Sequence, residues 1–103
     1  MAMFKTEPSV SRRVADINPN LDTRVRIIGK IIDTQQGFFV MDDGSGRITV
    51  SYSDESPKPV ELSTGLLVRV IGFVIPSEPV EIQGEIIHDM SGLNIKYLDI
   101  LRQ

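Results

Sequence analysis

Side chains suited to contact a nucleic acid recur at alternate positions along three extended stretches of this chain. Positive side chains attract phosphates and aromatic rings stack on bases, and every second residue of a β-strand points to the same face of its sheet. The residues that we expect on one outward face are Arg26, Lys30, Phe38, Val40, Arg47, Thr49 and Ser51, and Tyr52, which ends the third stretch, completes the candidate site. The alternative is that Arg26 and Lys30 only make an exposed strand hydrophilic. The predicted fold is needed to choose between these two interpretations.

Residues that could carry out catalysis or hold a metal are sparse. Asp42 and Asp43 are adjacent carboxylates, but a tight turn accounts for Asp43 and the end of a hairpin for Asp42. His88 is the only histidine and lies in an apolar row, which favours a core or edge position. The chain has no cysteine, no HExxH motif and no glycine-rich phosphate loop in the required context. We therefore predict a protein that is not an enzyme and has neither a metal nor a cofactor.

The stretch that must position the outward residues is a predicted β-hairpin over residues 37–52. Phe39 and Met41 alternate with outward residues before the turn, and Ile48 and Val50 do so after it. This period of two gives each strand one buried and one exposed face. The sequence DGSG at 43–46 predicts the turn, because glycine tolerates positive φ and an aspartate can accept hydrogen bonds from its own backbone.

Three further strands are predicted over residues 24–33, 66–75 and 81–88. Gly29 and Gly72 fall in inward rows, where a mid-strand glycine indicates a sharp bend or the close approach of another backbone. In the last strand, Ile82 and Ile86 should point inward. Five antiparallel strands that coil in this way close into a small barrel without exposed edges. The predicted fold class is all-β: a five-stranded OB-fold barrel with a short N-terminal helix and a C-terminal helix.

The two helices are expected to flank the barrel. Val10, Val14 and Ile17 recur at helical spacing within residues 9–17. The second helix spans residues 91–102, and its apolar arc is wider than the roughly 100° stripe that faces a core. The residues of that arc that we assign to a protein interface are Leu93, Tyr97, Leu98, Ile100 and Leu101. The alternative is that this helix only plugs one end of the barrel.

Length and charge set the remaining expectations. We expect a flexible N-terminus at 1–8 and a single domain at 9–103 that includes the C-terminal helix. The net charge of −3 divides into +1 up to Tyr52 (seven Lys or Arg against six Asp or Glu) and −4 from Ser53 onwards (four against eight). A nucleic-acid surface should therefore lie in the first half. No apolar run approaches the ~18 residues of a membrane span, so we expect a cytoplasmic protein with no membrane partner.

Three parts of the chain resemble the OB domains of replication protein A. They are VADINP at 14–19 with VRIIGKI at 25–31, FVMDDGSG at 39–46 with ITV at 48–50, and VRVIGFV at 68–74. The resemblance covers residues 14–101. It is strongest to the small single-OB proteins of archaeal replication protein A systems, although anticodon-binding OB domains share the hairpin and fourth-strand motifs.

This resemblance implies binding of single-stranded DNA, or of RNA, in the DNA replication and repair of an archaeal cytoplasm. OB folds bind oligonucleotides across the central hairpin, so the outward residues of that hairpin would form the site. With few cations and one outward phenylalanine, we expect weak binding that salt suppresses. The alternative is a small scaffold subunit that does not bind DNA. In this family, helices after the barrel join subunits, so its partner would be a larger subunit of the same type or a second copy, held through the C-terminal helix.

Overall fold

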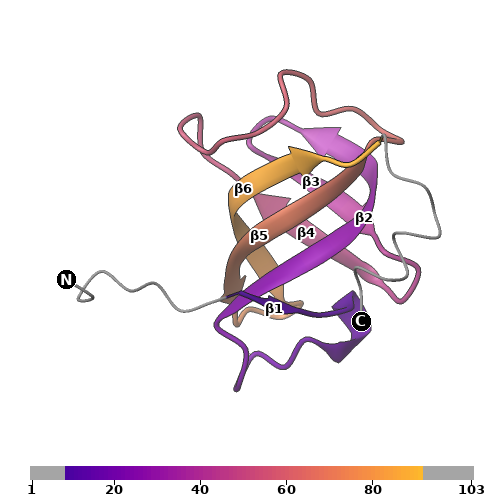
Figure 1. Cartoon of the computed structure of the whole chain (residues 1–103). Helices are drawn as coiled ribbons and strands as arrows, with labels where there is room; N and C mark the ends of the chain where they lie inside the picture. The colour runs from indigo at the N-terminus through magenta and orange to yellow at the C-terminus, as the bar shows by residue number, and fades with distance from the viewer. Residues whose placement is uncertain (1–8, 92–103) are drawn as a thin grey trace.

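The computed structural model describes residues 9–91, which form six β-strands and one short 3-10 turn (Figure 1). The strands are β1 (Val10–Ser11), β2 (Arg24–Gln35), β3 (Phe38–Asp42), β4 (Arg47–Ser51), β5 (Leu67–Ile75) and β6 (Glu81–Asp89). The 3-10 turn η2 spans Val14–Asp16. The strands β2 to β6 confirm the five strands predicted from the alternation of apolar residues, with ends that differ by at most two residues.

The five longer strands close into a barrel because β2 pairs with different neighbours along its two halves. Residues 24–30 lie antiparallel to β5, and residues 30–35 lie antiparallel to β3, which is followed by β4 and β6. We predicted a wholly antiparallel barrel, but β4 and β6 run parallel, with Val50 opposite Ile82. An odd number of strands cannot alternate in direction around a closed ring, so one junction must be parallel. The short β1 lies outside the ring, alongside β2 (Figure 1).

Gly29 and Gly72 lie where the backbone of a neighbouring strand leaves no room for a side chain. A Cβ atom added to Gly29 would lie 2.7 Å from the backbone oxygen of Asp42 on β3, and one added to Gly72 would overlap the backbone oxygen of Gln83 on β6. Both oxygens belong to the main chain and cannot rotate away. The prediction that these glycines mark close backbone approach is confirmed.

The inward rows of the strands meet in one apolar core. Its side chains are Val25, Ile27, Ile31, Phe39, Met41, Ile48, Val50, Val68, Val70, Ile82 and Ile87. One predicted member is wrong: Ile87, 2% exposed, takes the inward place that we gave to Ile86. The pairing of β5 with β6 skips Glu85, and an extra residue in one strand reverses the face of every side chain that follows it.

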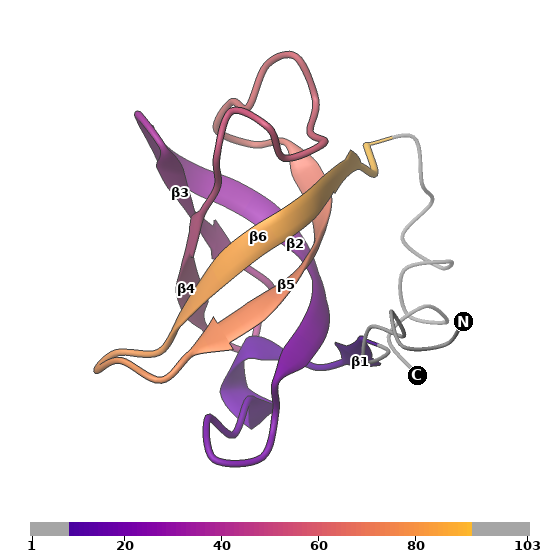
Figure 2. The same ribbon diagram turned by 90° about the vertical axis from the view of Figure 1, so that its left-hand side faces the viewer.

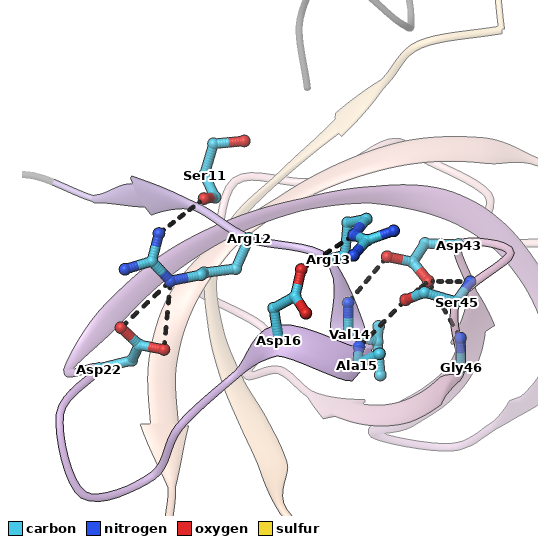
Figure 3. A network of polar contacts seen from close by, with 10 residues as sticks. All are labelled: Ser11, Arg12, Arg13, Val14, Ala15, Asp16, Asp22, Asp43, Ser45 and Gly46. Atoms are coloured by element: carbon cyan, nitrogen blue, oxygen red, sulfur yellow. Dashed lines mark hydrogen bonds and ion pairs between the residues drawn. The ribbon is translucent and has the colours of Figure 1, made fainter. Parts of the chain in front are cut away.

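The segment before β2 is not the helix that we predicted. Its first residues form β1, and only the single turn η2 is helical. A helix this short is marginal by itself, and contacts with distant residues replace it. The backbone N–H of Arg12 donates to the carbonyl of Arg26 at 3.1 Å, and that of Val14 donates to Oδ2 of Asp43 at 2.8 Å (Figure 3). Val14 and Ile17 still pack against the core.

The predicted fold class, a barrel flanked by two helices, is therefore wrong at its N-terminal flank. Residues 9–91 contain no α-helix, and the C-terminal helix predicted over 91–102 lies outside the described residues except for Ser91. The interface residues assigned to that helix lie outside them as well: Leu93, Tyr97, Leu98, Ile100 and Leu101. In the part of the chain that the structure describes, no helix has the length and apolar character needed to cross a membrane.

Candidate nucleic-acid interface

The outward side chains of β3 and β4 form a surface between two loops. Phe38 stands opposite Ser51, and Val40 stands opposite Thr49. Phe38 is 38% exposed, and the other three are half-buried. A pocket of about 390 Å³ lies here, lined by Gln36, Gly37, Phe38, Thr49, Ser51 and Glu81. The turn between β2 and β3 and the loop between β5 and β6 project on this side of the barrel, above and below the two strands (Figure 2).

Two cations lie at one end of this surface and flank a carboxylate. Lys30 on β2 stands opposite Asp42 on β3, which in turn stands opposite Arg47 on β4. Arg47 Nε lies 3.3 Å from Asp42 Oδ2, and the Arg47 side chain is 72% exposed. An exposed pair of this kind contributes at most about 1 kcal/mol. Arg47 can therefore exchange Asp42 for a phosphate at little cost.

Two further carboxylates make the surface less positive than the sequence pattern indicated. Asp33 stands opposite Val40 on β3, and Glu81 stands beside Thr49 on β4. Asp33 reaches this face because the pairing of β2 with β3 skips Ile32. The alternation of apolar and polar residues in the sequence does not reveal this irregularity. With Asp42, three carboxylates share this face with Lys30 and Arg47, so the local potential is mixed.

Two of the predicted site residues lie elsewhere. The ring centroid of Tyr52 is 6.0 Å from that of the core residue Phe39, and Lys58 Nζ lies 5.4 Å from the Tyr52 centroid. Arg26 is on the β5 side of β2, where its Nη1 donates to the carbonyl and hydroxyl of Ser9 at 2.7 and 2.8 Å. The predicted residues that the structure brings together are Lys30, Phe38, Val40, Arg47, Thr49 and Ser51.

Asp43, next to this surface, contributes to its shape. The residue is 8% exposed. Its Oδ1 accepts hydrogen bonds from Ser45 N at 2.9 Å, Ser45 Oγ at 2.7 Å and Gly46 N at 3.2 Å, and its Oδ2 accepts from Val14 N at 2.8 Å (Figure 3). Burial raises the pKa of Asp43, but the hydrogen bonds from Ser45, Val14 and Gly46 outweigh it and hold the pKa below its ordinary value. The bonds within the turn confirm the sequence prediction, whereas the contact with Val14 is evident only in the fold.

The chemistry available at this surface is that of binding. In residues 9–91, no three His, Asp or Glu side chains gather in a way that could hold a metal ion. His88 is exposed, and its Nδ1 lies 3.0 Å from Arg69 Nη2 on the outside of β5. The surface at Phe38 offers an aromatic face, two hydroxyl groups and two cations. These groups can stack, donate hydrogen bonds and attract phosphates.

Solved structures share this barrel. A chain of the S. pombe Stn1–Ten1 complex superposes with a TM-score of 0.68 at 16% identity, over 94% of this chain and 90% of that one. The telomere capping protein Ten1 of S. pombe gives 0.67 at 18% identity, over 92% and 94%. A chain of a replication protein A heterotrimer bound to single-stranded DNA gives 0.65 at 14% identity, over 84% and 71%. The barrel is an OB fold.

The likeness to replication protein A-type barrels is confirmed at the level of the fold. Identities of 14–18% establish architecture alone, so they do not transfer a ligand or a partner to this chain. The chain matches no protein-family model and no curated protein sequence. What this OB barrel does must be argued from its own side chains.

Proposed function

We propose that this chain binds single-stranded DNA through the outer face of β3 and β4, as a replication protein A-type protein in DNA replication or repair. The observation that carries the proposal is Phe38, which lies 38% exposed at a pocket between the β2–β3 turn and the β5–β6 loop. This is the place where OB barrels bind oligonucleotides. A chain of a replication protein A heterotrimer bound to single-stranded DNA has the same fold, which supports single-stranded DNA as the ligand.

The binding mode follows from the chemistry of each group. The Phe38 ring stacks on one base, which is worth ~1–3 kcal/mol. Thr49 and Ser51 border the same pocket. The Thr49 hydroxyl can bond a base edge or a sugar, and the Ser51 hydroxyl can do so by accepting, or by exchanging its long 3.4 Å hydrogen bond to the Ile82 carbonyl. Lys30 and Arg47 contact phosphates at the far end of the two strands. One stacking residue and two cations give weak binding that falls steeply with salt.

A second candidate is a scaffold subunit that binds a protein and no nucleic acid. The observation that favours it is the trio of carboxylates on the same face: Asp33, Asp42 and Glu81. These side chains repel phosphates and suit a basic protein surface. The fold neighbours from the Stn1–Ten1 complex support an OB barrel that works as one member of an assembly.

Fluorescence anisotropy of a labelled single-stranded oligonucleotide at low and high salt tests the first candidate. Phe38→Ala should weaken binding by about 5- to 150-fold, the equivalent of one lost stacking contact. Phe73→Ala is the matched control, because Phe73 is also 38% exposed but lies on β5 at a different pocket. An RNA oligonucleotide of the same sequence tells whether the site prefers DNA.

The two candidates predict opposite results. If the parent protein gives no anisotropy change at low salt, or if Phe38→Ala and Phe73→Ala bind as the parent does, then this face is not a DNA site. The scaffold candidate then predicts that a charge reversal such as Glu81→Lys abolishes capture of a basic partner protein while leaving the barrel folded. Circular dichroism of each variant checks the folding.

A further inference from the structure

One pocket lies on the other flank of β2, beside β1, and is independent of the surface at Phe38. Its volume is about 390 Å³, and among the residues that line it are Arg12, Arg26, Ile28, Asp43, Arg69 and Ile71. It shares no lining residue with the pocket at Phe38. We propose that this arginine pocket binds a phosphate monoester between Arg26 and Arg69.

Arg26 and Arg69 are diagonal neighbours on adjacent strands. Arg26 stands opposite Ile71, and Ile28 stands opposite Arg69. All four side chains therefore rise from the same face, and the two arginine positions are separated by the ~7–8 Å that is usual for diagonal pairs. Two long guanidinium side chains at this separation can reach a single anion placed between them. Ile28, which is buried, and Ile71, which is half-buried, form the apolar floor.

Neither of these two arginines forms an ion pair with a carboxylate among the described residues. Arg26 Nη1 donates to the uncharged backbone and hydroxyl oxygens of Ser9. Arg69 Nη2 lies 3.0 Å from His88 Nδ1, while Arg69 Nε is buried without a hydrogen-bond partner. A buried donor without an acceptor is unfavourable. If the Arg69 side chain turns so that Nε faces the pocket, an oxyanion bound there also supplies the acceptor that this donor lacks.

The other charged residues of the pocket have their own partners. Arg12 Nε lies 3.3 Å from Asp22 Oδ1, and its Nη1 donates to the Ser11 carbonyl at 3.2 Å (Figure 3). Asp43 uses both of its oxygens to accept hydrogen bonds from Val14 and from its own turn. Asp22 offsets the charge of Arg12, whereas Asp43 stays negative because all of its hydrogen-bond donors are uncharged. The two positive charges of Arg26 and Arg69 exceed the one negative charge of Asp43, so the pocket is positive on balance.

The ligand class follows from the charge, the donors and the size. Guanidinium groups bind phosphate oxygens through paired N–H donors, and a phosphate has enough acceptors for two such groups. The volume falls in the lower part of the range for small-molecule pockets, so there is room for an organic group beside the phosphate, against Ile28 and Ile71. A free mononucleotide and the 5′-phosphate end of a single strand share this chemistry.

Nuclear magnetic resonance of the full chain, labelled with 15N, tests the proposal without an oligonucleotide. The probes are inorganic phosphate, a nucleoside 5′-monophosphate and the same nucleoside without its phosphate. We expect the Arg69 Nε–Hε resonance to shift with the monophosphate and not with the nucleoside. Arg69→Gln should weaken monophosphate binding by about tenfold or more, since a charge-assisted fork is lost. Arg13→Gln is the matched control: Arg13 is a nearby exposed arginine paired with Asp16 and does not line the pocket.

Several results would overturn the proposal. One is a shift of the Arg69 Nε–Hε resonance that sodium chloride reproduces at equal ionic strength. Another is an equal loss of monophosphate affinity in Arg69→Gln and Arg13→Gln, which would indicate nonspecific electrostatic attraction. If Arg69→Gln does not fold by circular dichroism, Arg26→Gln takes its place with the same expected loss. Oligonucleotides with a 5′-phosphate and a 5′-hydroxyl then separate the two sources of the ligand. Because monophosphate binding is measured alone, it can succeed or fail independently of DNA binding at Phe38.

Discussion

Asp42 and Asp43 are neighbours in the sequence, yet they belong to regions of different character. Asp43 is 8% exposed and accepts four hydrogen bonds, which tie η2 to the β3–β4 turn. We call Val14, Asp43, Ser45 and Gly46 the locked turn. Asp42 points to the outer face, where its Oδ2 pairs with the largely exposed Arg47 and its Oδ1 accepts a hydrogen bond from the exposed Gly44 N at 2.7 Å. The contacts of Asp43 are buried or half-buried, whereas both contacts of Asp42 are with exposed groups that water or a ligand can reach.

Within this one hairpin, the turn at Asp43 contributes to stability and the outer face at Asp42 is available for binding. Buried groups that are fully hydrogen-bonded are costly to disturb, because each orphaned partner loses its contact and cannot reach water. Exposed ion pairs contribute little to stability and exchange partners readily. The locked turn should therefore respond to mutation through unfolding, and the outer face through affinity. Each of the following predictions tests that division.

The largest effect is expected at the locked turn. Asp43→Ala should lower the free energy of unfolding by about 2–3 kcal/mol, because Val14 N, Ser45 N and Gly46 N lose their acceptor. Asp42→Ala should lower it by only about 1 kcal/mol, because its ion pair with Arg47 is exposed and water can replace it as the acceptor for the exposed Gly44 N. Urea unfolding followed by circular dichroism measures both. Equal losses in the two variants would contradict the division between the two regions.

The same carboxylate should make stability depend on acid. The folded pKa of Asp43 is below its ordinary value, so its contribution is fully present above the unfolded pKa near 3.8 and is lost as the pH falls through the folded value. The parent protein should therefore lose stability relative to Asp43→Asn as the pH is lowered below about 4. Urea midpoints at a series of pH values measure the difference. A difference that does not change with pH would assign the effect to some other carboxylate.

A smaller effect is expected on the outer face, in affinity alone. Arg47→Gln should weaken oligonucleotide binding and reduce the slope of log K against log salt by about 0.7, the value for one lost phosphate contact. Its urea midpoint should stay close to that of the parent, because the ion pair with Asp42 is exposed. Anisotropy titrations over a range of salt give the slope. An unchanged slope would remove Arg47 from the proposed site.

The smallest effect should come from the acidic side of the same surface. Glu81→Gln should strengthen oligonucleotide binding by at most about 1 kcal/mol at low salt, because its carboxylate borders the pocket at Phe38. The gain should fade as salt rises. Glu61→Gln serves as the control, since Glu61 is exposed in the loop between β4 and β5. Weaker binding by Glu81→Gln would instead indicate that Glu81 contacts the ligand directly.

Much of the barrel could be predicted because alternation is a local property of a strand. Phe39 and Met41 on one strand, and Ile48 and Val50 on the next, are apolar at every second position and are all buried. The bonds of Asp43 within its turn are local as well. In the same way, the outward positions of Phe38 and Thr49 follow from their neighbours in the chain.

The features that the sequence did not predict depend on the pairing of segments that are distant in the chain. The skipped residue in β6 exchanges Ile86 for Ile87 in the core, and the one in β2 brings Asp33 to the outer face. The position of a bulge depends on how two strands coil around each other, so it cannot be predicted from the sequence of one strand. Arg26 lies away from the predicted site because its half of β2 pairs with β5, where its Nη1 donates to the oxygens of Ser9. The apolar residues around η2 have helical spacing. A helix this short is only marginally stable, so hydrogen bonds to the barrel determine the conformation of this segment instead.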